Sequence, residues 1–241
     1  TKEFENAIFY DVIITSKDEI AVAGINFQPG NNRQSLLMIT DIQGNVIDEN
    51  SVGGPYYEEA RALVELESGN FILSGSTNGQ GAGGFDTYFV KFSNEAEALW
   101  DTTYGSANTD RVYDMILDSN GDLVVAGSTN RNSDLEHLML KIDTLGKLIW
   151  EKTYSSSVTN TLYDIQESKR GGYISVGGYY SGSTGLLPVM LRTDMDGTQL
   201  WLRQYDEAGF TETFVFTALE TSNNDIYILG SGYNASFIRT D

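Results

Sequence analysis

The sequence predicts an all-β protein built from five copies of one four-stranded antiparallel unit. Five glycines recur at gaps of 51, 52, 50 and 53 residues, and each ends a short apolar run: Gly24, Gly75, Gly127, Gly177 and Gly230. A fixed period near 50 residues is typical of one supersecondary unit repeated along the chain. No segment of useful length shows the i, i+3, i+4, i+7 apolar spacing of a helix.

The third copy shows the unit most clearly. Four apolar or alternating runs read as strands, at 111–117, 122–126, 137–142 and 147–154. The first two runs are separated by Asp118-Ser119-Asn120-Gly121 and the last two by Asp143-Thr144-Leu145-Gly146, which have the composition of tight turns. Each unit is therefore expected to be four short strands with hairpin connections.

Other residues recur with the glycines and are read as scaffold. Tyr-Asp pairs stand in the first strand of three copies: Tyr10-Asp11, Tyr113-Asp114 and Tyr163-Asp164. A basic residue recurs in the third strand: Lys91, Lys141, Arg192 and Arg239. We expect these acids and bases to pair within or between units. Trp100, Trp150 and Trp201 are expected to fill the space between neighbouring units, because large aromatic side chains dominate such burial.

Four-stranded units repeated radially are the blades of a β-propeller. The predicted fold is thus a five-bladed β-propeller in a single domain, residues 1–241, with blades at about 5–51, 52–105, 106–155, 156–206 and 207–241 plus 1–4. The fifth copy ends before its fourth strand, and residues 1–4 resemble the end of one. Pairing of this N-terminal segment with residues 236–240 is expected to close the ring and remove an exposed sheet edge.

Composition narrows the functions that this chain can have. A net charge of −19 argues against binding to nucleic acid or to an anionic membrane surface. No apolar stretch approaches the length of a transmembrane helix. The absence of cysteine excludes disulfides, thiol catalysis and thiolate metal sites. We expect no cofactor.

Two acidic runs resemble metal loops, and one histidine is present. The runs at 118–122 and 194–197 place Gly too early for a helix-flanked calcium loop, so plain turns are expected and no metal site is predicted. His137, the sole histidine, stands mid-strand without a nucleophile elbow, which favours an ordinary strand residue.

Long variable loops gather on one predicted face, where function usually lies on a rigid scaffold. Aromatic rings with carboxylates suit the apolar faces and hydroxyl rims of sugars, although these tyrosines could instead only pack the loops. The candidate ligand-binding residues are Tyr56, Tyr57, Glu58, Glu59, Asp110, Arg111, Tyr179, Tyr180, Phe210 and Tyr233.

The string Leu140-Lys141-Ile142-Asp143-x-x-Gly146-x-x-x-Trp150, with the Tyr-Asp pair and the glycine that ends the second strand, resembles exported β-propeller repeats of Bacteroidetes surface lipoproteins and secreted proteins. The resemblance covers essentially the whole chain. It implies export to the outer membrane surface, the periplasm or the medium, often with a lipid anchor upstream of residue 1, and mostly binding roles. The repeat is also somewhat similar to that of quinone-dehydrogenase propellers.

Three functions are compatible with these residues. The expected one is a non-catalytic extracellular or cell-surface binding or scaffold protein with a carbohydrate or protein ligand. The alternative is a glycoside hydrolase that uses carboxylates at the channel mouth, with Glu58 or Glu59 as an acid and Asp11, Asp114 or Asp164 lining the channel; such an enzyme needs two carboxyl groups across a cleft. The third is a purely structural adhesion or assembly module.

Overall fold

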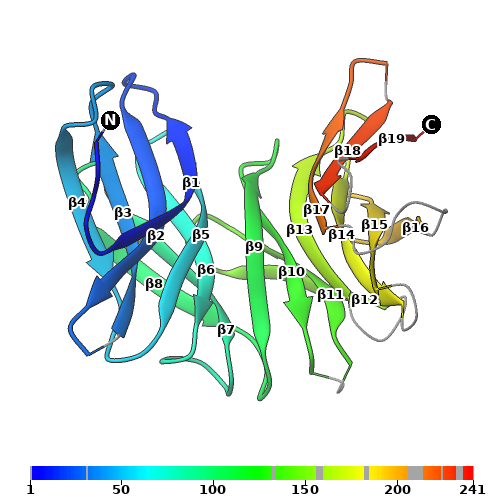
Figure 1. Ribbon diagram of the computed structural model, residues 1–241, viewed down its shortest axis with the longest axis horizontal. Helices are drawn as coiled ribbons and strands as arrows, with labels where there is room; N and C mark the ends of the chain where they lie inside the picture. The colour runs from blue at the N-terminus through cyan, green and yellow to red at the C-terminus, as the bar shows by residue number, and fades with distance from the viewer. Residues whose placement is uncertain are drawn as a thin grey trace. The chain divides into compact units, whose positions relative to one another are not determined.

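A computed structural model describes residues 2–30, 32–131, 134–155, 160–181, 185–205, 214–223, 225–231 and 236–240. These residues contain 19 strands and no helix, so none of them forms a helix that could cross a membrane (Figure 1). The all-β prediction is confirmed.

The strands form five antiparallel sheets. The first holds β1 (Ala7–Ile14), β2 (Ile20–Gln28), β3 (Asn32–Thr40) and β4 (Val46–Val52). The second holds β5 (Glu58–Glu65), β6 (Phe71–Thr77), β7 (Asp86–Phe92) and β8 (Ala98–Tyr104). The third holds β9 (Asp110–Leu117), β10 (Leu123–Thr129), β11 (Glu136–Ile142) and β12 (Leu148–Tyr154).

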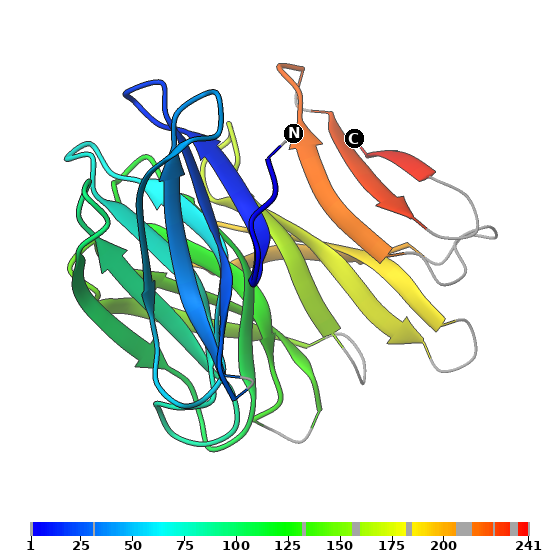
Figure 2. The ribbon, with the colours of Figure 1, turned by 60° about the vertical axis from the view of Figure 1, so that its left-hand side comes forward.

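The fourth sheet holds β13 (Asn160–Glu167), β14 (Tyr173–Ser181), β15 (Gly185–Thr193) and β16 (Gln199–Gln204) (Figure 2). The fifth has only β17 (Phe214–Glu220), β18 (Ile226–Ser231) and β19 (Ser236–Thr240), as expected from its missing fourth strand. Residues 2–4 form no strand, so their pairing with 236–240 stays a prediction. The chain divides into two compact units, residues 1–117 and 118–241.

Four of the periodic glycines are explained by a bulge in the first strand of their sheet. The register between β1 and β2 shifts after Phe9, directly opposite Gly24, and the same shift faces Gly75, Gly177 and Gly230. A Cβ added at Gly75 would lie 1.8 Å from the carbonyl oxygen of Glu59, and at Gly24 1.9 Å from that of Ile8. Only glycine lets the bulged backbone approach so closely.

The Asp-x-x-Gly motif forms the tight turns that join the first strand of a sheet to the second, or the third to the fourth. In the turn at Asp143, the carboxylate accepts the backbone N–H groups of Leu145 and Lys147, and Gly146 adopts a φ of 85°. Asp41, Asp118 and Asp194 accept from the residues two and four positions on in the same way. The predicted turns at 118–121 and 194–197 are therefore formed, each held by its own aspartate.

Acidic side chains join neighbouring sheets within each unit. The Asp11 carboxylate accepts the N–H of Val12 at the bulge and the N–H of Leu63 from the next sheet, both at 2.8 Å. Asp164 accepts the N–H of Ala218 in the second unit. The expected pairing of the Tyr-Asp acid with the third-strand base is wrong here, because the bulge aims Asp11 and Asp164 at backbone donors of the following sheet.

Apolar side chains fill the space between sheets. In the second unit, Trp201 packs on a buried cluster that joins the fourth and fifth sheets, Ile174, Val176, Met190, Val215, Ile226 and Ile228. Trp150 of β12 packs on Tyr173 of the fourth sheet, with ring centroids 6.2 Å apart. These two tryptophans therefore fill the inter-sheet space, as predicted.

Candidate functional site

Three predicted site residues, Tyr57, Glu59 and Arg111, come together in the first unit at the N-terminal ends of β5 and β9, where the loops between the sheets lie; this end of the strands is called the loop end. Glu59, the second residue of β5, is buried with 1% of its side chain exposed. Its carboxylate accepts from Arg61 Nη2 at 2.9 Å, from Arg111 Nη1 at 3.5 Å and from the Tyr57 hydroxyl at 2.9 Å. Two strands and a connecting loop thus converge on one carboxylate.

Arg61 owes its position to the bulge of β5. The register shifts between Ala60 and Ala62, so Arg61 is the extra residue of the bulge. The matching residue of the first sheet is Tyr10, and the Arg61 guanidinium lies 3.9 Å above that ring. Bulges commonly re-aim a side chain beside a functional site.

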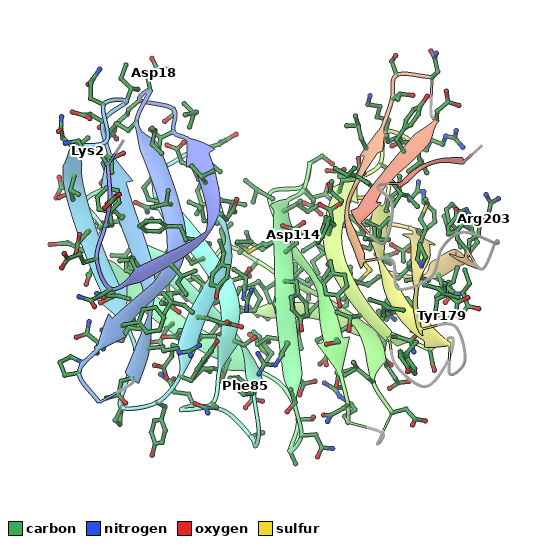
Figure 3. All side chains as sticks on the ribbon, in the orientation of Figure 1. Lys2, Asp18, Phe85, Asp114, Tyr179 and Arg203 are labelled. Atoms are coloured by element: carbon green, nitrogen blue, oxygen red, sulfur yellow. The ribbon has the colours of Figure 1, made fainter. Side chains whose placement is uncertain are left out.

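Aromatic rings hold all three arginines of the site. The Arg111 guanidinium lies 3.7 Å from the centre of the Phe85 ring, and Arg33 lies 4.5 Å from that of Tyr57. Tyr57 and Phe85 pack edge to face at 5.3 Å, and Figure 3 shows Phe85 at the loop end of the unit. The arginine cluster is defined as Arg33, Tyr57, Glu59, Arg61, Phe85 and Arg111.

The charge of Glu59 stabilises the protonated forms of its neighbours. Burial alone would lower the pKa of Arg61, but the hydrogen bond and charge of Glu59 outweigh it, so that pKa is raised. Burial, together with the charge of Glu59, raises the pKa of the Tyr57 hydroxyl. Tyr57 therefore donates to Glu59 as a neutral phenol.

Two further acids, Glu58 and Asp110, come one residue earlier on the same strands and point to the opposite face. Glu58 accepts the N–H of Gly54 and the hydroxyl of Thr77, each at 3.1 Å. Burial raises the pKa of Glu58 above its usual range, because these bonds compensate only part of the lost hydration. Asp110 accepts the N–H and hydroxyl of Ser106.

Asp86, the first residue of β7, lies beside Asp110. A Cβ added at Gly105 would lie 1.9 Å from Asp86 Oδ1 and 3.1 Å from Asp110 Oδ2, so these two oxygens are within about 5 Å. Asp86 is fully buried, and burial followed by the charge of Asp110 raises its pKa. Asp86 is thus a second carboxyl group, with Glu58, that is shifted toward the neutral form.

The remaining predicted residues do not join this cluster. Tyr56 stands next to it and is 55% exposed. In the second unit, Tyr179 is buried and Tyr180 is exposed. Phe210 and Tyr233 lie outside the described residues. Asp11 and Asp164, weighed as channel-lining acids, have the inter-sheet scaffold bonds described above.

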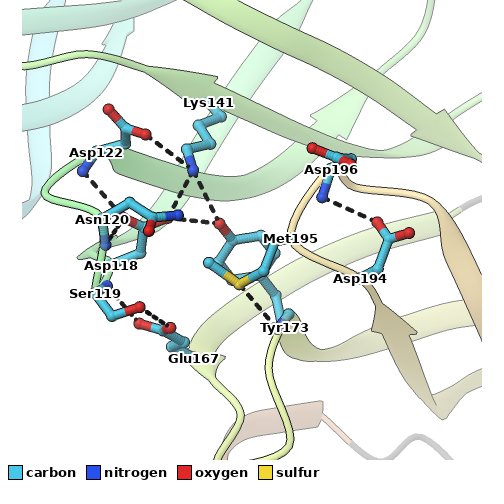
Figure 4. Close-up of polar contacts among 11 residues, drawn as sticks. Asp118, Ser119, Asn120, Asp122, Lys141, Glu167, Tyr173, Asp194, Met195 and Asp196 are labelled. Atoms are coloured by element: carbon cyan, nitrogen blue, oxygen red, sulfur yellow. Dashed lines mark hydrogen bonds and ion pairs between the residues drawn. The ribbon is translucent and has the colours of Figure 1, made fainter.

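A polar network in the second unit accounts for the acidic run at 118–122 (Figure 4). Lys141 Nζ lies 2.8 Å from Asp118 and 3.0 Å from Asp122, and the Tyr173 hydroxyl donates to Asp118 at 2.6 Å. Burial would raise the pKa of Asp118, but the donors outweigh it and hold that pKa low. Within the described ranges, no group of three or more histidines and acids is placed to hold a metal.

His137 is the second residue of β11 and is buried, as expected for an ordinary strand residue. Neither ring nitrogen has a hydrogen-bond partner among the residues that the structure describes. Burial lowers its pKa to about 3, so the imidazole is neutral at physiological pH.

Sequence reasoning found Tyr57, Glu59 and Arg111 but missed Arg33, Arg61 and Asp86. A signal for Arg61 exists in the sequence: in three other sheets the bulged residue is aromatic, namely Tyr10, Tyr163 and Phe216. The second copy alone has Arg61-Ala62 at the Tyr-Asp position. Arg33 and Asp86 belong to no such motif, and only the fold brings them near.

No family model matches the chain, and no curated protein matches it by sequence. Solved structures do match. An α-L-arabinanase from Penicillium chrysogenum, complexed with arabinobiose, has a TM-score of 0.64 at 11% identity over 99% of this chain and 78% of its own. An α-L-arabinofuranosidase from Fusarium graminearum has a TM-score of 0.57 at 11% identity, over 96% of this chain and 91% of its own. A protein of unknown function from Bacteroides caccae has a TM-score of 0.56 at 11% identity, over 91% of this chain and 68% of its own.

At this identity the likeness shows the fold alone, and it places the chain among β-propeller-like proteins with five groups of strands. It also corrects the function expected from sequence. The expectation of a non-catalytic binding or scaffold protein is wrong: the similar structures include carbohydrate-cleaving enzymes, which favours the hydrolase alternative. Glu58 and Glu59, which the sequence offered both as ligand-binding residues and as acids of that alternative, form an acid pair that no other copy has.

Proposed function

We propose that this protein is a glycoside hydrolase that binds carbohydrate at the loop end of β5 and β9. One observation carries the proposal: Glu58 and Glu59 are a single-copy acid pair placed beside the arginine cluster. The equivalent pairs in the neighbouring copies are Ala7-Ile8, Asp110-Arg111 and Asn160-Thr161. The arabinanase and arabinofuranosidase with a similar fold support this reading.

Glycoside hydrolysis needs one carboxyl group that gives a proton to the leaving oxygen and one carboxylate that acts as nucleophile or activates water. Glu58 fits the proton donor, because burial raises its pKa and keeps it toward the neutral form. Glu59 fits the carboxylate, since it forms ion pairs with Arg61 and Arg111. Glu58 and Glu59 are consecutive in β5, so their carboxyl groups leave opposite faces of that strand, and the saccharide would have to cross the loop end of the strand between them.

Tyr56 supplies an apolar platform next to the proton donor. A Cβ added at Gly79 would lie 2.6 Å from Glu58 Oε1 and 2.8 Å from Cδ2 of the Tyr56 ring, so the carboxyl group and the ring are neighbours. Exposed aromatic rings pack on the C–H faces of sugars, which orients the glycosidic oxygen. A sugar stacked on Tyr56 would therefore lie close to Glu58.

The proposal is tested by release of reducing ends from arabinan, xylan and polygalacturonate. We expect hydrolysis of at least one polymer by the purified protein, and a loss of at least a hundredfold in Glu58→Gln and in Glu59→Gln. Glu67→Gln, in an exposed turn, is the matched control and should retain activity. Absence of hydrolysis on every polymer, or full activity of Glu59→Gln, would refute the assignment.

We also propose that the protein is exported and that its ring is closed by residues 1–4. Export suits polymeric substrates, which do not enter cells, and cell fractionation tests it. Closure would supply the fourth strand that the fifth sheet lacks. Deletion of residues 1–4 should then lower the melting temperature, and an unchanged value would count against closure.

A further inference from the structure

We infer that the saccharide recognised at this site is anionic, carrying a carboxylate or a sulfate ester. The inference rests on the proposed function for the place where the saccharide binds. It comes from the three arginines Arg33, Arg61 and Arg111, because hydrolysis by the acid pair alone would need no arginine. A hydrolase for neutral sugars needs two carboxyl groups and a stacking surface, and three convergent guanidinium groups add a requirement for negative charge.

The arginines are unusual for this chain. It has 15 basic residues against 34 acidic ones, yet three arginines meet at the loop end of one unit. Within the arginine cluster their one acidic partner is Glu59, so the group carries an excess of positive charge. A local cluster of positive charge attracts small anions, even though the protein as a whole is acidic.

The guanidinium groups retain donors for a ligand. Each has five N–H donors, and towards Glu59 Arg61 uses Nη2 while Arg111 uses Nη1. Arg61 Nε is buried and has no hydrogen-bond partner within the described residues, so it is not among the donors that a ligand can reach. The two side chains are 26% and 29% exposed, so a ligand can reach them. A carboxylate or sulfate matches the planar edge of a guanidinium with two parallel hydrogen bonds.

The rings fix these donors before a ligand arrives. Tyr10, Tyr57 and Phe85 each have one guanidinium carbon 3.7–4.5 Å from the ring centre, a contact that reduces the rotamer entropy lost on binding. A hollow of about 200 Å³ is lined by Phe9, Tyr10, Asp11 and Val12, and so adjoins the ring that carries Arg61. The site therefore has both a rigid anion-binding edge and nearby space.

The other acids near the cluster have hydrogen-bond donors of their own. Glu58 and Asp110 point to the opposite faces of β5 and β9, where loop N–H groups at Gly54 and Ser106 bind them. Asp86 accepts the N–H of Ala82 from the β6–β7 loop. Each has its own donors, which leaves Glu59 as the partner of the arginines.

The test is calorimetric titration with trigalacturonate, a sulfated disaccharide and neutral arabinotriose. We expect an anionic saccharide to bind at least tenfold more tightly than the neutral one, with affinity that falls as salt is raised. The carboxylate and sulfate arms identify the anion. Equal or tighter binding of arabinotriose, or binding that salt does not affect, would overturn the inference.

Two variants separate ligand recognition from a merely structural role. Glu59→Gln removes the competing charge and frees both guanidinium groups, so the affinity for the anionic saccharide should rise about tenfold even as hydrolysis is lost. Arg111→Gln should weaken it at least tenfold, while Arg203→Gln, an arginine that lies over Trp201 in the second unit, should not change it. If Arg111→Gln does not fold, Glu59→Gln decides alone, since unchanged or weaker anion binding contradicts the inference.

The two proposals can fail separately. Arginine-dependent binding of an anionic saccharide without any hydrolysis would refute the hydrolase and leave this inference standing. Hydrolysis of arabinan that depends on Glu59 but shows no preference for anionic sugars would refute this inference and leave the hydrolase standing.

Discussion

Replacement of His137 by leucine should reduce the loss of folding stability at acid pH. The size of this effect follows from how far burial lowers the pKa of the ring. The imidazole is fully buried in β11, and its pKa is lowered to about 3, against 6.5 for an exposed histidine. Above pH 6.5 neither the folded nor the unfolded state is protonated, and the ring's titration has no effect on stability. Below that value the unfolded chain takes up a proton that the folded protein excludes.

The stability contributed by the neutral ring is therefore lost as the pH falls from 6.5 towards 3, at about 1.4 kcal/mol per pH unit. At pH 4.5 the wild-type chain should have lost about 2.7 kcal/mol relative to His137→Leu, compared with their difference at pH 7.5. That corresponds to roughly 5–10 °C in melting temperature for a chain of this size. Taking the difference between two pH values removes the packing effect of the substitution itself.

The assay is urea unfolding of both proteins at pH 7.5, 6.5, 5.5 and 4.5, followed by tryptophan fluorescence. His137 is the only histidine, and all carboxylates are shared, so the pH dependence of the difference belongs to this ring. A difference that stays constant from pH 7.5 to 4.5 would show that the ring protonates in the folded state. The argument from burial would then be refuted.

Three further substitutions test other parts of the account by denaturant unfolding. Lys141→Met should cost about 3 kcal/mol, because it leaves the buried Asp118 carboxylate without its cation; a cost under about 1 kcal/mol would show that the ion pair is not needed. Gly75→Ala should lower the free energy of unfolding by about 3 kcal/mol, because the new Cβ would force the Glu59 carbonyl away. Gly54→Ala, whose Cβ would meet nothing nearer than 3.9 Å, should be tolerated, and an equal loss of stability in the two variants would contradict the bulge explanation. Glu58→Gln should stabilise the protein more at pH 8 than at pH 4. The pKa of Glu58 is raised by burial, so ionisation of this carboxyl group destabilises the folded protein as the pH rises. The opposite trend would show that Glu58 is well solvated.

The scaffold could be predicted because its requirements repeat. Gly24 and Gly75 mark a bulge that admits no side chain, and the turn at Asp143 needs an acid and a glycine at fixed spacing. Repetition makes such local constraints visible in one sequence. The pairing of Asp11 with a backbone N–H of the next sheet could not be predicted, because it depends on how the bulge turns the side chain.

The candidate site could be predicted only in part, because its contacts join residues that are far apart in the chain. Glu59 and Arg111 are 52 residues apart and meet only because β5 and β9 are neighbouring first strands. Arg33, the second residue of β3, donates its backbone N–H to the carbonyl of Tyr56 in the segment before β5, and this bridge brings it beside Tyr57. These residues occur once, so no period reveals them. Arg61 was recognisable as a break in the Tyr-Asp motif.

Hydrogen exchange measured with and without saccharide tests the central claim, that carbohydrate binds at the loop end of β5 and β9. With trigalacturonate or another saccharide that binds, the account predicts slower amide exchange in residues 53–61 and 105–111, and no such slowing with a saccharide that calorimetry shows not to bind. Protection confined to the second unit, or no change at either segment at saturating saccharide, would contradict it.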